Sequence, residues 1–195
     1  IRGDGAGTAG GARMQMDRSV IVACDVLALE ELSRLVSSTC DIPKIGGYKV
    51  GFALGLKHGL RRVVQTIRAS TDKPIMYDHQ KGGTDVPHTG AIFAEVMAEA
   101  GVDYAILFPF ASPSTESTWI DELVKKGVTP IVGAMMTIPD FLSTSGGFLD
   151  SSAVRRILEI ACSKGVKDFV LPGNKPAQGK ELRTIIESYT KCASY

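Results

Sequence analysis

The feature that most constrains the fold is a regular alternation of short apolar runs with longer helical patterns, which begins at Ser19. Runs rich in β-branched residues predict strands, and apolar residues spaced three and four apart predict helices. The expected strands cover residues 20–25, 48–52, 74–78, 104–108, 129–134 and 168–171. The expected helices cover residues 28–38, 59–69, 90–100, 114–126, 151–163 and 180–191. Such consecutive strand–helix units predict a parallel sheet, because each helix returns the chain to the same end of the sheet.

Glycine stands just beyond the last turn of three of these helices, at Gly101, Gly127 and Gly165. A glycine at that position readily takes the left-handed conformation that ends a helix. We therefore expect those three helices to end at their glycines.

Periodicity alone leaves open a doubly wound open sheet and a closed eight-stranded barrel. The polar residues favour the barrel, because Asp25, Lys49, Asp78 and Thr137 lie at or near the carboxyl ends of different strands. A barrel brings those ends to one mouth, whereas an open sheet spreads them along an edge. A complete barrel takes roughly 250 residues. We therefore expect a (β/α)8 TIM barrel of which the chain holds about six strand–helix units.

Composition indicates a globular protein with one domain. The 195 residues are 44% hydrophobic, and 22 basic and 21 acidic residues give a net charge of +1. That balance argues against a nucleic-acid partner, and no apolar stretch is long enough to span a membrane. Residues 1–18 are rich in glycine and are expected to form a flexible leader or tag. Residues 19–195 are expected to form the single barrel domain, without its last two units.

The cysteines and histidines show no pattern of a metal site, a disulfide framework or a catalytic triad. We expect reduced thiols in a cytoplasmic protein, with Cys24 packed in the core. The histidines are expected at the surface, or next to the site residues without direct contact with a substrate. These residues are Cys24, Cys40, Cys162, Cys192, His58, His79 and His88.

The densest group of opposed charges follows the third expected strand, where Asp78, Lys81 and Asp85 share a loop with Gly82 and Gly83. The two glycines are expected to make the loop supple. Such a loop is commonly a solvated turn, in which exposed ion pairs contribute only about 0 to 1 kcal/mol. Alternatively it is an active site, because catalytic groups of barrel enzymes collect at the carboxyl ends of the strands.

Two further charges bear on this choice. Lys49 stands in a strand that looks buried, and an unpaired ammonium there would be costly. Asp25 either belongs to the same mouth or only caps the helix that begins near Ala28.

Four segments in chain order resemble the orotidine 5'-monophosphate decarboxylase family, over residues 19–195. The family's motif after the third strand is Asp-x-Lys-x-x-Asp-Ile-Pro-Asn-Thr, and the matching loop here is the most specific part of the resemblance. The four segments are Val22-Ala23-Cys24-Asp25, Tyr48-Lys49-Val50-Gly51-Phe52, the loop with Asp78, Lys81 and Asp85 that continues as Val86-Pro87-His88-Thr89, and Met136-Thr137-Ile138-Pro139.

The spacing in this loop is Asp78-x-x-Lys81-x-x-x-Asp85, one residue longer in each gap than the family motif. Side chains alternate between the faces of a strand, so an offset of three places Asp78 and Lys81 on opposite faces. A bulge or an early turn near His79 and Gln80 is therefore needed to turn Lys81 back toward Asp78.

The resemblance implies decarboxylation of orotidine 5'-monophosphate to uridine 5'-monophosphate in pyrimidine biosynthesis, without metal or other cofactor. By resemblance, Lys81 would stabilise the carbanion at C6 and deliver the proton, and Asp78 would face the substrate carboxylate. Lys49 and Asp85 would complete an alternating charge network. Asp85 would reach the neighbouring subunit's site, which implies a homodimer.

The substrate-binding residues also come from the resemblance. Asp25 would bind the ribose hydroxyls, and Thr137 and Pro139 would bind the substrate, with Thr137 against the pyrimidine. The residues with which the family binds the substrate phosphate are expected beyond Tyr195.

Two other functions stay open. A related barrel enzyme, hexulose-phosphate synthase or ketogulonate-phosphate decarboxylase, would use magnesium and an enediolate. Asp85-Val86-Pro87-x-Thr89 favours the orotidylate branch over these enzymes. A non-catalytic barrel remnant is the third possibility, which the altered spacing of the loop favours.

Overall fold

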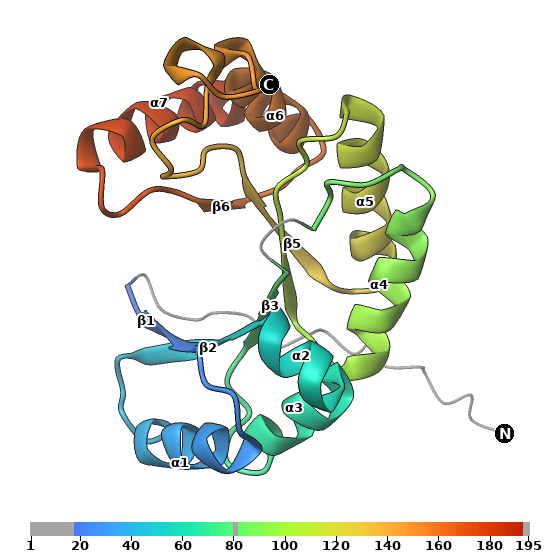
Figure 1. Ribbon diagram of the computed structural model, residues 1–195, viewed down its shortest axis with the longest axis vertical. Coiled ribbons are helices and arrows are strands. Elements are labelled where there is room, and N and C mark those ends of the chain that lie inside the picture. The colour runs from blue at the N-terminus through green and yellow to red at the C-terminus, as the bar shows by residue number, and fades with distance from the viewer. Residues whose placement is uncertain (1–17, 80–81, 193–195) are drawn as a thin grey trace, which may run out of the picture.

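Six parallel strands form one curled sheet in the computed structural model, which describes residues 18–79 and 82–192 (Figure 1). The strands lie in chain order, so that β1 and β6 are the edges of the described sheet. They are β1 (Val20–Cys24), β2 (Ile45–Gly51), β3 (Ile75–Asp78), β4 (Tyr104–Leu107), β5 (Thr129–Gly133) and β6 (Asp168–Val170). The architecture is therefore a partial β/α barrel, as the alternation in the sequence predicts.

Helices alternate with the strands along the chain. They are α1 (Leu29–Thr39), α2 (Phe52–His58), α3 (Leu60–Arg68), α4 (Thr89–Ala100), α5 (Pro113–Lys125), α6 (Ser151–Ser163) and α7 (Pro176–Cys192), with a short 3-10 helix at Ser143–Ser145. Three of them end as expected, because Gly101, Gly127 and Gly165 have φ angles of 81°, 75° and 78°.

Two differences from the expected elements lie around β2. This strand begins at Ile45 rather than at residue 48, because Gly46 and Gly47 carry no side chains to show a strand pattern. Phe52 was expected to end the strand, but it begins α2, a helix that the sequence did not predict. In this short helix only Leu54 is buried, so it lacks the apolar periodicity that marks longer helices.

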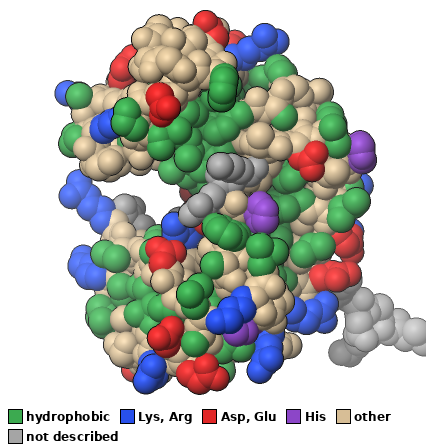
Figure 2. All heavy atoms as spheres, viewed as in Figure 1, with side chains coloured by type: hydrophobic (Ala, Val, Ile, Leu, Met, Phe, Trp, Pro, Cys, Tyr) green, Lys and Arg blue, Asp and Glu red, His purple; other side chains and the backbone are tan. Residues whose placement is uncertain are grey.

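The two faces of the sheet carry separate hydrophobic clusters. Along β4, Ala105 and Leu107 belong to the larger cluster, which is shared with the helices, whereas Tyr104 and Ile106 belong to a smaller cluster that contains no helix residue among its buried members. The difference follows from the alternation of side chains along a strand. Figure 2 shows the molecule hollowed on the side where β1 and β6 stand apart, with hydrophobic side chains on its upper wall.

Three thiols of the described chain are free, and they belong to Cys24, Cys40 and Cys162. Cys24 is buried, as expected for core packing. Its burial, and next the nearby charge of Asp25, raise the pKa of this thiol to about 12. Among the described residues, no helix is both long enough and apolar enough to cross a membrane.

Glu116 is the exception among the acidic residues of α5, because it is buried. The residue is only 1% exposed, and the Oε1 atom of its carboxyl has no hydrogen-bond partner among the described residues. Burial raises the pKa of this carboxyl from 4.5 to about 8. The folded protein therefore binds a proton at Glu116 more tightly than the unfolded chain does.

We predict that Glu116→Gln raises the free energy of unfolding at alkaline pH and has little effect near pH 4. Because the pKa is higher in the folded state, the wild type loses stability as the pH rises from 4.5 to about 8. The gain should be on the order of a few kcal/mol above that window. Urea unfolding at about pH 4 and about pH 9 measures it. Glu122→Gln on the same helix is the control, and an equal gain at both pH values would contradict the assignment.

Candidate active site

The carboxyl ends of β2 and β3 hold an ion pair between two of the expected site residues. Lys49 Nζ donates a hydrogen bond to Asp78 Oδ2 over 3.0 Å. In the register of the two strands, Lys49 lies opposite Met76 and Gly51 lies opposite Asp78. Lys49 and Asp78 are therefore diagonal neighbours on one face of the sheet. Their side chains are 29% and 12% exposed, so solvent screens this pair less than a surface pair.

Asp25 follows the last residue of β1 and lies next to Gly51, the residue of β2 that pairs with Asp78. A Cβ atom placed on Gly51 would be 3.9 Å from Asp25 Oδ1, so the missing side chain of Gly51 leaves open space next to the Asp25 carboxylate. A pocket of about 130 Å3 lies there and is lined by Asp25, Gly51 and Phe52, among others. The alternative role of Asp25 as a helix cap is wrong, because α1 has Ala28 as its N-cap and receives no side-chain cap hydrogen bond.

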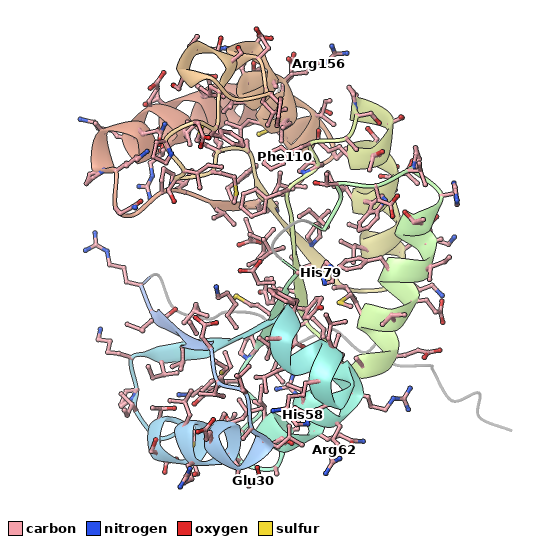
Figure 3. The ribbon with its side chains drawn as sticks, in the orientation of Figure 1. Glu30, His58, Arg62, His79, Phe110 and Arg156 are labelled. Atoms are coloured by element: carbon pink, nitrogen blue, oxygen red, sulfur yellow. The ribbon has the colours of Figure 1, made fainter. Side chains whose placement is uncertain are left out.

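Lys81 and Gln80 lie outside the described residues, so their expected roles stay predictions. The chain on either side is described: β3 ends at Asp78, and His79 follows it outside the strand. His79 Nδ1 and Tyr77 Oη are hydrogen-bonded over 2.7 Å, and His79 is exposed near the middle of the molecule (Figure 3).

The glycine pair after β3 packs against the end of β4, which corrects the expectation of a supple loop. Gly82 and Gly83 are buried, and Gly83 has a φ angle of 87°. A Cβ atom on Gly82 would lie 3.1 Å from the carbonyl oxygen of Ile106. The amide of Phe108 donates to the Gly82 carbonyl over 2.7 Å, and Thr84 Oγ1 donates to the Phe108 carbonyl over 2.7 Å. The glycines therefore allow residues 82–84 to pack closely against the chain at the end of β4.

Helix α5 holds the next part of the loop. Thr115 Oγ1 donates to the carbonyl of Asp85 over 2.7 Å, and Trp119 Nε1 donates to the carbonyl of Val86 over 3.2 Å. Both side chains are buried. The Asp85 carboxylate is exposed and accepts a hydrogen bond from the Val86 amide over 2.7 Å. Within residues 18–79 and 82–192, Asp85 forms no ion pair, so it does not join the Lys49–Asp78 pair in a single chain.

The remaining expected site residues follow β5. Thr137 and Pro139 are exposed, at the carboxyl end of the sheet that also carries Asp78. Met136, just before them, is partly buried against both hydrophobic clusters. The structure thus anchors this segment through Met136 and leaves Thr137 and Pro139 facing solvent.

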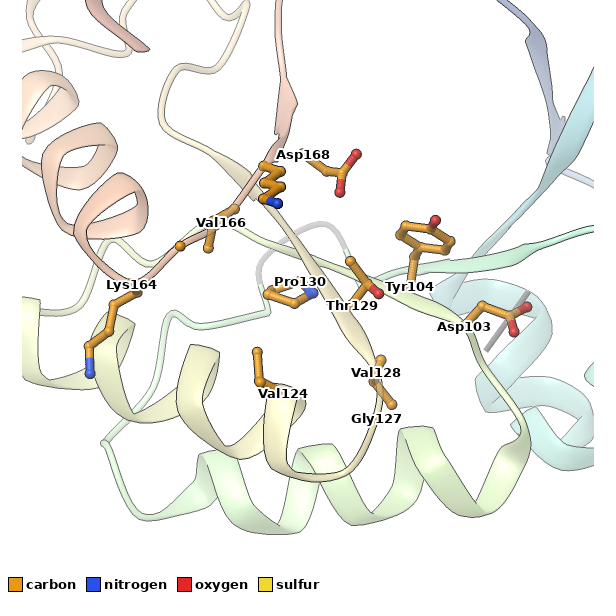
Figure 4. A pocket seen from close by; sticks show the side chains of 12 residues that line it. Asp103, Tyr104, Val124, Gly127, Val128, Thr129, Pro130, Lys164, Val166 and Asp168 are labelled. Carbon is orange, nitrogen blue, oxygen red and sulfur yellow. The ribbon is translucent and has the colours of Figure 1, made fainter. Parts of the chain in front are cut away.

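A second pocket lies at the opposite end of the sheet, beside the first residues of β4, β5 and β6 (Figure 4). Its volume is about 360 Å3, and its lining includes Tyr104, Thr129 and Asp168. Asp103 in the same lining is bound to Arg68 over 2.6 Å and to the amide of Ile75 over 2.8 Å, which ties neighbouring elements together. In β/α barrels, residues at the amino ends of the strands contribute to stability, whereas active sites lie at the carboxyl ends. The candidate active site is therefore the group of Asp25, Lys49 and Asp78.

Sequence reasoning did not predict that Thr115 and Trp119 hold this loop. No local pattern marks either residue, because each acts on a loop about thirty positions earlier in the chain. A partial signal was Gly90, where a Cβ atom would lie 2.6 Å from Trp119 Cδ1, so that only glycine leaves room for the indole.

The fold and the charged group define a β/α-barrel protein with an enzyme-like site at the carboxyl ends of its strands. The profile of the orotidine 5'-phosphate decarboxylase / HUMPS family matches residues 18–191, and the chain belongs to this family. A search of curated proteins finds no match.

Solved structures share the fold. An orotidine 5'-monophosphate decarboxylase from Methanocaldococcus jannaschii superimposes with a TM-score of 0.74 at 22% identity, over 87% of this chain and 78% of that chain. An orotidine 5'-phosphate decarboxylase from Pyrococcus horikoshii OT3 gives a TM-score of 0.69 at 22% identity, over 86% and 74% of the two chains. One from Lactobacillus acidophilus gives 0.68 at 21% identity, over 87% and 77%.

We predict that Thr115→Val loosens the loop at Asp85. The substitution keeps the shape but removes the hydroxyl donor, at a cost on the order of 1 kcal/mol of unfolding free energy. Amide hydrogen exchange at Val86 and Thr89 should become faster. Thr115→Ser keeps the hydroxyl donor, so it should restore the exchange rates and the free energy of unfolding. Thr118→Val, on the same helix, is the matched control. Unchanged exchange in Thr115→Val would show that this hydrogen bond does not hold the loop.

Proposed function

We propose that the protein decarboxylates orotidine 5'-monophosphate to uridine 5'-monophosphate without a metal or other cofactor. The observation that carries this proposal is the Lys49–Asp78 ion pair beside Asp25, at the strand ends of a chain that belongs to this family. One of the similar structures, the enzyme from M. jannaschii, was solved in complex with the inhibitor BMP. A nucleotide substrate for this chain is consistent with that relative.

The chemistry rests on opposed charges. Loss of CO2 from C6 of the pyrimidine leaves the bonding electron pair on that carbon. An ammonium group at that position stabilises the developing negative charge and then supplies the proton, and we assign both tasks to Lys81. Asp78 would stand against the departing carboxylate. Lys49 fixes the direction of the Asp78 carboxylate through their 3.0 Å hydrogen bond.

The substrate would be held by residues that follow β1 and β5. The Asp25 carboxylate accepts hydrogen bonds and would bind the ribose hydroxyls, in the open space beside Gly51. From the segment after β5, Thr137 would contact the pyrimidine, and Pro139 would also bind the substrate. We also propose a cytoplasmic location, which the three free thiols of the described chain support.

We propose a homodimer in which Asp85 serves the partner's site. Its exposed carboxylate forms no ion pair within the described part of one chain. Exposed apolar side chains lie close by in sequence: Val86 is 46% exposed, and Ile92 and Val96 on α4 are 65% and 47% exposed. Ile92 and Val96 are four residues apart and so share one helix face. Such a surface next to Asp85 fits a subunit interface.

The magnesium-dependent barrel enzymes are the second candidate, because the matched family also includes the HUMPS branch. Among the described residues, no three His, Cys, Asp or Glu side chains gather as metal ligands would. Turnover that stops in the presence of a chelator would favour this branch over the orotidylate branch.

We predict that the wild type decarboxylates orotidine 5'-monophosphate and that Lys81→Ala lowers kcat by at least about a thousandfold, since it removes both the charge and the proton donor. The absorbance change of the pyrimidine measures turnover, with chelator present throughout. Lys125→Ala, on the exposed end of α5, is the control for loss of a lysine. Full activity of Lys81→Ala would refute the role of Lys81. An inactive wild type would support the non-catalytic alternative.

We predict that a mixture of two inactive variants, Lys81→Ala and Asp85→Ala, recovers activity. In a mixed dimer one site receives both Lys81 and Asp85 from unsubstituted positions, so equal mixing should restore about a quarter of wild-type activity. The mixture is measured after exchange of subunits, and each variant alone is the control. If the mixture stays inactive while both variants are dimers, Asp85 acts within its own chain.

A further inference from the structure

A pocket of about 240 Å3 lies between the segment that follows β4 and helix α6, apart from the Lys49–Asp78 site. Its walls are mainly apolar and include Phe110, Ala153 and Ile157. Figure 3 shows Phe110 toward the middle of the molecule and Arg156, another lining residue, at the outer edge. Glu116 of α5 lines the same pocket.

Glu116 is the polar group of this lining whose bonding capacity is unused. The hydroxyl of Ser112 already caps α5 by accepting from the Thr115 amide over 3.1 Å. The hydroxyl of Ser152 donates to Asp150 Oδ1 over 2.6 Å. Arg156 is exposed, so water screens its charge. Glu116, in contrast, is 1% exposed, and its Oε1 has no partner among the described residues.

A buried carboxyl without a partner costs free energy of folding, and native proteins keep few of them. Here the cost is visible as the raised pKa of Glu116. Such groups concentrate at functional sites, where a ligand supplies the missing interaction. When the pH is above about 8 the carboxyl is ionised and can only accept, so the ligand must then bring a hydrogen-bond donor into an apolar pocket.

We propose that this pocket binds a small organic amine, whose ammonium group donates to Glu116 and whose apolar body packs against Phe110 and Ile157. A cation fits better than a neutral donor, because a charge-assisted hydrogen bond to an ionised carboxylate is stronger in a low-dielectric site. A metal ion fits less well, since Glu116 is the one carboxylate in the lining and hard cations take several oxygen ligands. This inference is independent of the proposed decarboxylase activity.

The test titrates the full-length protein with benzylamine at about pH 8 and follows binding by NMR, with benzyl alcohol as the neutral probe of similar shape. We expect saturable binding of benzylamine with shifts at Phe110 and Ile157. Glu116→Gln should weaken it by about tenfold or more, which corresponds to the loss of one hydrogen bond to a charged group. Benzyl alcohol should bind the wild type at least about tenfold more weakly than benzylamine.

Two further variants separate the pocket from general effects. Ala153→Leu should fill the pocket and abolish benzylamine binding while Glu116 is retained. Glu122→Gln removes a carboxylate elsewhere on α5 and should leave binding unchanged. The proposal fails if Glu116→Gln or Ala153→Leu, each shown to be folded, binds benzylamine as the wild type does. It also fails if benzyl alcohol binds equally well, or if benzylamine does not saturate, as expected for a pocket that holds only water.

Discussion

The candidate site depends on the parallel register of β1, β2 and β3. Ala23 pairs with Lys49, and Lys49 pairs with Met76, so the three strands reach the same end together. Lys49 and Asp78 then face the inner side of the curled sheet, while Cys24 and Val50 enter the core under the helices. A shift of one residue would exchange these faces and bury the charges against the helices. The same pairing that buries the core thus presents the charged group.

The loop after β3 has a different kind of support, because neighbouring elements hold it. Phe108 and Thr84 tie it to the end of β4, and Thr115 ties the backbone of Asp85 to α5. These bonds fix the main chain and leave the carboxylate of Asp85 exposed. A residue held in this way can present its charge to a second molecule without movement of its backbone, which reduces the ordering cost of association.

Much of the fold could be predicted because its signals are local. Each strand is a short apolar run, and each predicted helix has its own periodicity, so the six units and their parallel order followed. The placement of Asp25, Lys49 and Asp78 at or near strand ends could be predicted from the same local runs, whereas their roles stay predictions. The start of β2 and helix α2 were missed, since Gly46 and Gly47 carry no strand signal and α2 buries only Leu54.

What the sequence could not show depends on contacts between distant residues. Gly82 and Gly83 were expected to make a supple loop, because glycine is flexible in isolation; against β4 their missing side chains allow close packing instead. Thr115 carries no local mark of its bond to Asp85. Glu116 looks like an ordinary polar residue of a helix, yet it is 1% exposed in the folded chain.

The position of α5 explains why Thr115 and Glu116 are both buried although they are adjacent. This helix lies between α4 and α6 (Figure 1), so two of its sides are covered. Thr115 and Trp119, four residues apart, face the loop before α4, where backbone carbonyls accept their hydrogen bonds. Glu116 is turned by about 100° from Thr115 around the helix and lines the pocket that α6 borders, where Oε1 has no hydrogen-bond partner among the described residues. Lys49 and Asp78 offset each other's burial within the chain, whereas Oε1 of Glu116 has no hydrogen-bond partner among the described residues.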